Sequence, residues 1–210
     1  MDVSVSDAAA YLGVTPRRVR AMIAEGRLAA RQIAGRHIID TRDLAQPRAC
    51  SRPMSQRIAW AAILGPDNTG WLSPPEKSRL KRRLAELASQ PDAAQILASW
   101  LASRAVATRY ECPEPSTLNE DSRLVASGVS DPRSQIVGGG WEFYTQPGQA
   151  PGVIHDHLLV PDPHGPVVLR EAPIQVPDPP PVLLVAVDLY DSGEPRSMDR
   201  AAQLIQEAAL

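Results

Sequence analysis

The sequence that decides the fold of the N-terminal region spans residues 4–23 and reads SVSDAAAYLGVTPRRVRAMI. It contains two short helical patterns that lie three residues apart. Ser4 and Asp7 have the spacing of a capping box, which predicts that the first helix begins just after Ser4. Gly13 is expected to end this helix, because glycine readily adopts the left-handed conformation common at helix C-termini. Thr15 then stands as the N-cap of the second helix.

The second helix begins with Pro16 at its first position and is expected to end at Gly26. Its apolar stripe consists of Val19, Met22 and Ile23. Beyond it, two short strands at 28–33 and 36–39 flank the turn Ala34-Gly35, which predicts a β-hairpin. Two helices three residues apart, followed by a small hairpin, are typical of a winged helix-turn-helix.

Two arginines occupy positions at which a helix disfavours positive charge. Arg17 and Arg18 lie in the first turn of the second helix, where the helix dipole destabilises a cation by about 0.3 to 1 kcal/mol. Violations of a local rule are expected at functional sites, and a phosphate or a guanine edge facing this helix end would offset the cost. Because the apolar stripe lies on the opposite face, we expect Arg17, Arg18 and Arg20 to project outward, as in a recognition helix that enters a major groove.

The N-terminal region carries an ordered set of motifs, namely Asp7-Ala8-Ala9, Leu12-Gly13-Val14-Thr15, Gly26-Arg27-Leu28 and Gly35-Arg36. In these motifs it resembles the helix-turn-helix module of the excisionase and MerR-type family, over about a fifth of the chain. The resemblance implies sequence-specific binding of double-stranded DNA. The DNA-binding residues that it implies are Thr15, Arg17, Arg18 and Arg20 on the recognition helix and Arg36 and His37 in the wing.

Two features depart from that family. Asp7 stands where the family has glutamate, which preserves the cap, and no long heptad helix of the MerR type follows the module. The rest of the chain, at residues 71–74, 126–130 and 186–189, resembles more loosely the actinobacterial helix-turn-helix proteins of toxin-antitoxin operons. This second resemblance implies an antitoxin, with a toxin as its partner protein.

A helical segment is predicted for residues 54–127, after the winged helix-turn-helix domain at residues 1–53. Caps and apolar stripes predict its helices at 56–64, 73–87, 93–110 and near 116–127. Five of the seven residues from Lys77 to Arg83 are basic, which indicates either a solvated helix face or an auxiliary phosphate contact.

Residues 128–210 form the third predicted domain, which is acidic and rich in proline. Ten of the 35 residues from 147 to 181 are proline, which argues against long helices and central strands there. The apolar run 182–189 predicts a buried strand, and the pattern of residues 197–210 predicts a C-terminal helix. The predicted fold class is therefore α+β.

The charge of the chain is divided between its two ends. Residues 1–58 carry a net charge of +5 and residues 105–210 carry −9, although the whole chain has only −2. This division predicts two different partners, one of them a polyanion. We expect an autoregulating antitoxin that binds its DNA operator as a homodimer or cooperatively, and its toxin through the C-terminal part. The alternatives are an excisionase-like architectural factor and a regulator that responds to a small molecule.

The sequence does not indicate catalysis. His155, His157 and His164 are candidate metal ligands, but no further ligand lies at a standard metal spacing from them. Residues 138–140 are glycines but lack the lysine and the hydroxyl residue of a phosphate loop. Asp188 and Asp191 are candidate carboxylates at the end of the predicted strand, although helix capping and solvation explain them equally well. The sequence therefore predicts a protein that is not an enzyme and that has no cofactor and no metal.

The cellular location follows from cysteine usage and hydropathy. Cys50 and Cys112 have no second thiol or histidine at metal spacing and are expected to be free thiols of a reducing compartment. No apolar run approaches the roughly 20 residues that a membrane span needs, and the N-terminus has no basic-then-apolar signal pattern. We therefore expect a cytoplasmic protein without membrane contact.

Overall fold

The computed structural model describes residues 2–12, 14–24, 28–33, 35–44, 52–88, 90 and 92–208, and the chain divides into two compact units, 1–48 and 49–210. The predicted ends at Gly13 and Gly26, the turn residue Ala34 and the thiol of Cys50 lie outside the described residues. The predicted domain boundaries after residues 53 and 127 stay predictions. Each unit has its own hydrophobic core.

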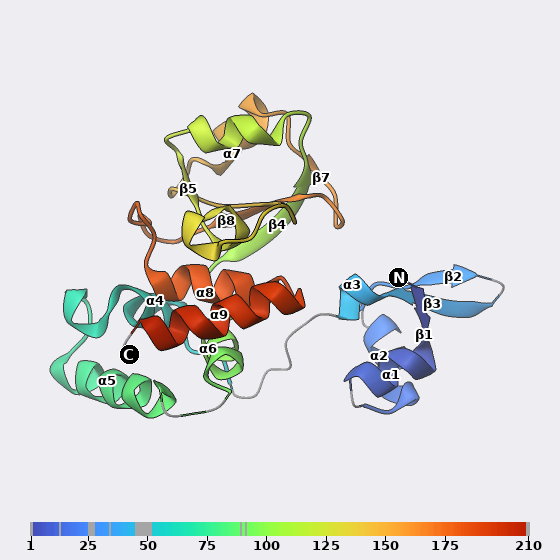
Figure 1. The fold of residues 1–210 in the computed structure, drawn as a ribbon, viewed down its shortest axis with the longest axis horizontal. Helices are drawn as coiled ribbons and strands as arrows, with labels where there is room; N and C mark the ends of the chain where they lie inside the picture. Colours follow the sequence, from blue (N-terminus) through green and yellow to red (C-terminus); the bar gives the residue numbers. More distant parts are fainter. Residues whose placement is uncertain are drawn as a thin grey trace. The chain divides into compact units, whose positions relative to one another are not determined.

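The first unit combines short helices with a small antiparallel sheet (Figure 1). Its elements in chain order are β1 (Asp2–Ser4), α1 (Val5–Leu12), α2 (Pro16–Ala24), β2 (Arg31–Ile33), β3 (Arg36–Asp40) and α3 (Thr41–Leu44). The strand order is β1-β3-β2, so β1, which the sequence analysis missed, pairs with the hairpin strand β3. The core residues of this unit are Ala8, Ala9, Val19, Leu28, Ile39 and Leu44.

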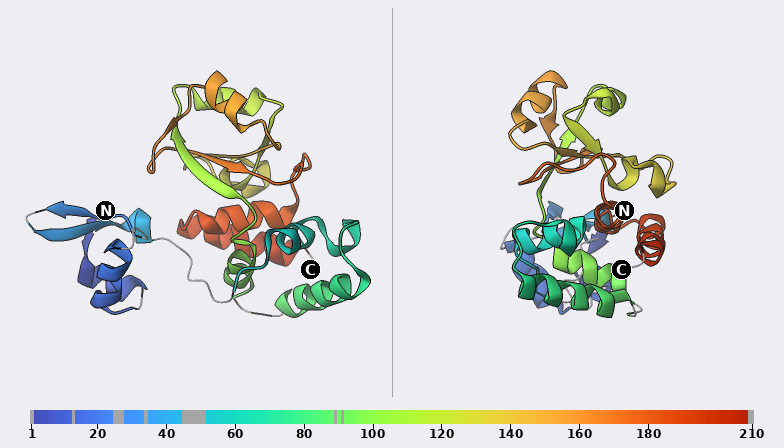
Figure 2. Two further views of the ribbon diagram at one scale, coloured as in Figure 1. Left: turned by 180° about the vertical axis from the view of Figure 1, so that it is seen from behind. Right: turned by 90° about the vertical axis from the view of Figure 1, so that its left-hand side faces the viewer.

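The second unit has a layer of helices beside a five-stranded sheet (Figure 2). The helices of this layer are α4 (Gln56–Leu64), α5 (Pro74–Ala88), α6 (Ala93–Leu101), α8 (Val182–Asp191) and α9 (Pro195–Glu207). Short 3-10 turns lie at Pro66–Asn68 (η1), Pro115–Glu120 (η2), Gly128–Ser130 (η3) and Pro132–Ser134 (η4). Helices from the middle of the chain and from its end therefore share one core.

The sheet lies between two helices. Its strands are β4 (Val106–Glu111), β5 (Leu124–Ala126), β6 (Trp141–Thr145), β7 (Val160–Pro161) and β8 (Val167–Glu171), in the order β5-β6-β8-β4-β7. The β6–β8 pair is parallel, whereas the β4–β7, β4–β8 and β5–β6 pairs are antiparallel. One face packs with α7 (Ala150–Asp156) around Phe143 and Leu169, and the other face meets α8 through Val125 and Tyr144 (Figure 1).

The predicted strand at residues 182–189 is wrong, because this segment is the helix α8. All eight residues from 183 to 190 are buried, so the run shows neither helical nor strand periodicity. A continuous apolar run of this length suits a buried strand and a helix buried on all sides equally well. The predicted C-terminal helix is confirmed as α9.

Three further expectations are corrected. The helix predicted at 93–110 ends at Leu101, and residues 106–111 form the strand β4, which pairs with β8 over residues 106–110. The segment 116–127 is the turn η2 followed by the short strand β5. The proline-rich stretch does hold a central strand, namely β8. No proline lies between Pro166 and Pro173, so each residue of β8 has a backbone N–H for pairing with the neighbouring strands.

The α+β class predicted from the sequence is confirmed, with the helix-turn-helix unit at the N-terminus. In the described part of the chain, every helix falls short of the length and apolar character that crossing a bilayer demands.

Candidate nucleic-acid interface

The first helix of the N-terminal unit is fixed by the predicted capping box. Asp7 N donates to Ser4 Oγ at 3.2 Å, while Asp7 Oδ2 accepts from Ser4 N at 3.3 Å and from Ser4 Oγ at 2.7 Å. At the other end, Val14 N donates to Ala9 O at 3.0 Å, a bond across the last turn that closes the helix. These local bonds set where the chain leaves α1 and starts the turn toward α2.

Thr15 is the N-cap of helix α2, as predicted. The carbonyl of Thr15 accepts from Arg18 N at 2.9 Å and from Val19 N at 3.1 Å, and Thr15 Oγ1 accepts from Arg18 N at 3.3 Å. The hydroxyl of Thr15 thus caps the helix with a lone pair and keeps its proton available for a further acceptor such as a phosphate oxygen. Thr15 itself is exposed.

The side chains of α2 divide into a buried stripe and an outer basic face. Val19 is 0% exposed, and Met22 and Ile23 pack partly buried against the same core. Successive helical residues are about 100° apart, so Arg17 lies almost opposite Val19 while Arg18 and Arg20 lie on its two flanks. All three arginines are exposed. Arg17 and Arg20, three residues apart, share one ridge, and Arg18 stands on the other side of the face.

The wing is the hairpin of β2 and β3, which extends beyond the helices in Figure 1. Gly35 adopts a φ of 76° at its turn, a conformation that favours glycine. Gln32 pairs with His37, and Ile33 pairs with Arg36. Because neighbouring strand residues point to opposite faces, half-buried His37 shares the core-facing side with Ile39, whereas exposed Arg36 points away from it.

An exposed basic helix beside a hairpin wing defines a DNA-binding helix-turn-helix domain, and the comparisons agree with this class. A family model described as a helix-turn-helix domain matches residues 3–46 of the chain. The N-terminal unit is therefore a helix-turn-helix domain. Searches of curated proteins and of solved structures found no match for this chain.

The candidate metal histidines are not brought together with further ligands. His155 lies near the end of α7 and pairs with Asp156, while His157 Nε2 lies 2.9 Å from Asp121 Oδ2. Arg123 already binds Asp121 and, through its hydrogen bonds, lowers the pKa of that carboxyl. Within the described ranges, the structure shows no group of three histidine, cysteine or acidic residues placed to hold a metal ion.

Sequence reasoning missed a buried cluster of charges in the second unit. It is formed by residues from the turn after α6 and from β6, β8 and α8, namely Arg104, Glu142, Tyr144, Arg170 and Asp188. Asp188 is neither a helix cap nor solvated: its carboxylate accepts hydrogen bonds from Arg104, Tyr144 and, at Oδ2, Ser127 Oγ. Burial opposes ionisation of this carboxyl, but Arg170 and Arg104 outweigh it and lower the pKa of Asp188. A lone aspartate in an apolar run is the one sequence signal for this cluster.

Proposed function

We propose that the protein is a sequence-specific transcription regulator that binds double-stranded DNA through α2 and the wing. The observation that carries this proposal is the division of α2: Val19 is fully buried, while Arg17 and Arg20 form an exposed basic ridge on the outer face. A helix anchored along one stripe presents its outer face rigidly, as reading of base edges in a major groove requires. Arg36 in the wing supplies a contact to the DNA backbone.

The test is a gel-shift titration with the full-length protein. The operator is first selected from fragments of the DNA upstream of the protein's own gene. Arg17→Ala and Arg18→Ala are expected to weaken operator binding by about 1 to 3 kcal/mol each if they read bases. Arg196→Ala is the matched control, because Arg196 is an exposed helical arginine of the second unit that lies outside the basic run 77–83. Unchanged affinity in both recognition-helix variants would contradict the proposal.

We further propose that the second unit binds a partner protein, and that the protein is an antitoxin that represses its own operon in the cytoplasm. The net charge of −9 over residues 105–210 supports this, because it repels DNA and attracts a basic partner. Since each unit has its own core, fragments 1–53 and 54–210 can be compared. The fragment 54–210 is expected to co-purify with the product of the neighbouring gene in the absence of DNA. If that product co-purified with fragment 1–53 and not with fragment 54–210, the partner-binding surface would belong to the first unit instead.

Assembly on DNA is part of the proposal. One helix-turn-helix domain covers a small site, and regulators gain affinity by binding two half-sites about 34 to 36 Å apart. We expect a dimer or cooperative binding, with the interface in residues 54–210. Footprinting that shows one half-site occupied by a monomer would contradict this part of the proposal.

The neighbouring genes distinguish the role as antitoxin from that of an excisionase-like factor. An adjacent toxin-like gene favours the antitoxin, and an adjacent integrase gene favours the architectural factor. The added unit of about 160 residues, with its own sheet and helical layer, favours a function beyond the DNA-binding module.

A further inference from the structure

A cavity of about 550 Å³ opens on the charged face of the sheet in the second unit. Strands β4, β6 and β8 form its floor, the segment 161–163 forms one wall, and the turn after α6 and the end of α8 form the other. Ala105 and Ala107 have small side chains, which leaves the space in front of Arg170 unfilled. In the β4–β8 register Ala107 stands directly opposite Arg170. The buried charge cluster therefore borders a cavity large enough for a small metabolite.

Arg170 forms the floor of this cavity and is held from three sides. Its side chain is 6% exposed, its Nε lies 3.3 Å from Asp188 Oδ1, and its Nη1 lies 3.5 Å from Glu142 Oε2. The guanidinium also lies over the ring of Tyr144, at 5.9 Å from the ring centroid. Among the residues that the structure describes, none accepts a hydrogen bond from Nη2 of Arg170. Because Arg170 lines the cavity, this unpaired N–H is available to a ligand there.

Arg109 supplies a second guanidinium on the same face. It pairs with Val168 in the β4–β8 register, which places it diagonally from Arg170 across two strands, within reach of long side chains. Its Nη1 donates to the carbonyl of Gly165 at 3.3 Å. Over the described ranges, no carboxylate oxygen lies within the 4.0 Å of a salt bridge to Arg109. The guanidinium of Arg109 thus lines the cavity without an ion-pair partner among the described residues.

The carboxylates around the cavity are largely compensated by other groups. Asp188 and Asp191 both pair with Arg104, and Asp191 Oδ2 lies 2.6 Å from Arg104 Nη2. Burial raises the pKa of Glu142 to about 7, against the opposing effect of Arg170, so near neutral pH a share of the molecules carries an uncharged carboxyl there. Asp162 Oδ1 accepts from the backbone N–H of His164 at 2.7 Å. Three arginines, Arg104, Arg109 and Arg170, thus stand among these carboxylates, and the donors left for a ligand are the guanidinium of Arg109 and Nη2 of Arg170.

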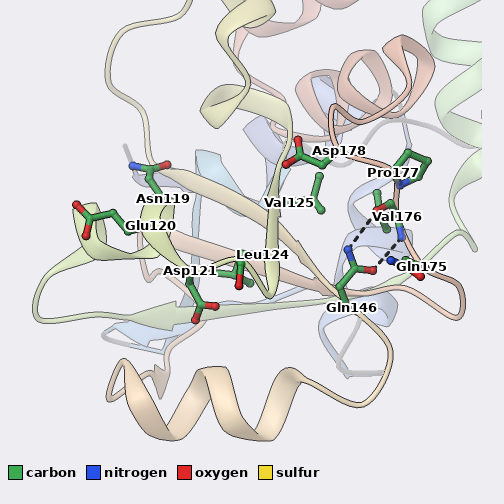
Figure 3. A pocket seen from close by; sticks show the side chains of 11 residues that line it. Asn119, Glu120, Asp121, Leu124, Val125, Gln146, Gln175, Val176, Pro177 and Asp178 are labelled. Atoms are coloured by element: carbon green, nitrogen blue, oxygen red, sulfur yellow. Dashed lines mark hydrogen bonds between the residues drawn. The ribbon is translucent and has the colours of Figure 1, made fainter.

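Another cavity, of about 600 Å³, differs in character (Figure 3). Its lining includes Glu120, Asp121 and Asp178 but no lysine or arginine. Gln146 closes one side by bonding both the N–H and the C=O of Val176, as the dashed lines in Figure 3 show. Acidic side chains alone define no ligand, whereas the cavity at Arg170 combines an N–H donor of Arg170 that has no acceptor with an arginine, Arg109, that has no ion-pair partner in the described ranges.

We propose that the cavity at Arg170 binds a small organic anion through its carboxylate or phosphate group. Arg170 receives the oxyanion from the floor and Arg109 from the rim. Guanidinium groups bind both carboxylate and phosphate oxygens with two parallel hydrogen bonds, and the alanine and proline side chains of the walls contact the rest of the ligand. This binding belongs to the second unit alone and does not depend on DNA binding by the first.

The test uses full-length protein with sodium phosphate and sodium succinate as probes and sodium chloride at matched ionic strength as the reference. Isothermal titration calorimetry is expected to show saturable binding of one anion per chain, with an increase in the unfolding temperature. The anion that saturates assigns the ligand to the phosphate or the carboxylate class. Absence of saturable binding for both probes would overturn the proposal.

Two variants locate the site without touching the buried ion pairs. Arg109→Gln is expected to weaken anion binding by about tenfold or more, because one charge-assisted contact is lost. Ala107→Leu fills the space opposite Arg170 and is expected to abolish binding, while the unfolding temperature without anion changes little. Unchanged anion affinity in both variants would show that the anion binds elsewhere and overturn the proposal.

The recognition helix offers arginines to phosphate as well, so it provides the matched control. The double variant Arg17→Gln, Arg18→Gln is expected to keep the anion affinity of the wild type while losing operator binding. Loss of anion binding in this variant would place the site in the first unit and overturn the proposal, whatever the outcome for DNA.

Discussion

Arg104 and Asp188 form an ion pair inside the second unit, with side chains 3% and 0% exposed. The pair connects the turn after α6 to the middle of α8, across 84 residues of sequence. Tyr144 OH completes it, since it donates to Asp188 Oδ1 at 3.0 Å and accepts from Arg104 Nε at 3.0 Å. The sheet and the helical layer therefore meet through charged and hydroxyl groups as well as through apolar contacts.

Asp188→Ala is expected to destabilise the second unit by about 3 to 5 kcal/mol, because it leaves the buried charge of Arg104 without its main partner. Urea unfolding of the full chain measures this change. Asp67→Ala is the control, since Asp67 pairs with Lys81 at an exposed site and its loss is expected to matter little. Equal effects of the two substitutions would show that the buried pair has no special structural role.

Glu142 is expected to make the stability of the second unit depend on pH. Burial raises its pKa to about 7, and the charges that face it are Arg170, Asp188, Arg109 and Asp191. A raised pKa in the folded state means that the contribution of this group is fully present below its unfolded pKa near 4.5 and is lost as the pH rises through 7. As the pH rises from 5 to 8, the free energy of unfolding of Glu142→Gln is expected to increase relative to that of the wild type by up to about 3 kcal/mol. Urea unfolding at both pH values measures the difference, and a difference that stays constant would contradict the raised pKa.

Thr15→Ala is expected to cost about 1 kcal/mol, because Thr15 Oγ1 no longer accepts from Arg18 N at the start of α2. Hydrogen exchange of the first-turn amides of α2 measures the loss directly. Thr15→Ser keeps the hydroxyl and is expected to retain the protection of these amides. Equal protection in the alanine and serine variants would show that the side-chain cap contributes nothing.

Arg36 and His37 are expected to behave differently although they are neighbours in the sequence. Arg36 points away from the core, so Arg36→Ala is expected to weaken the binding of specific and nonspecific DNA alike. The slope of the logarithm of the binding constant against the logarithm of the salt concentration is expected to fall by about 1. His37 shares the face of Ile39, so His37→Ala is expected to affect the stability of the wing more than DNA affinity. Gel shifts at several salt concentrations test both. A DNA effect of His37→Ala as large as that of Arg36→Ala would contradict the assignment of faces.

Features of the N-terminal unit were predictable because local bonds determine them. The caps at Ser4 and Thr15 join residues no more than four positions apart, and spacing in the sequence shows such bonds directly. Strand β1 escaped notice because its three residues acquire their role only by pairing with β3, more than thirty residues later. The exposure of Arg17 and Arg20 followed from helical periodicity once Val19 was placed in the core.

Much of the second unit was not predictable from local pattern. Residues 106–111 form a strand only because β8, sixty residues later, supplies hydrogen-bond partners. The buried cluster depends on contacts between four distant segments, and neither Arg104 nor Arg170 has a neighbour in the sequence that indicates its burial. Pairwise proximity across the fold, rather than propensity, determines both features.

The position of Asp188 has a consequence for how α8 can sit in the fold. Eight successive residues of this helix are buried, so apolar packing alone distinguishes poorly between one rotation of the helix and the next. A shift by one residue would turn the carboxylate by about 100° around the helix axis and separate it from Arg104, Tyr144 and Ser127. Asp188 thus selects a single rotational setting for a helix that its apolar residues leave free to slip, as single buried polar residues do in coiled coils.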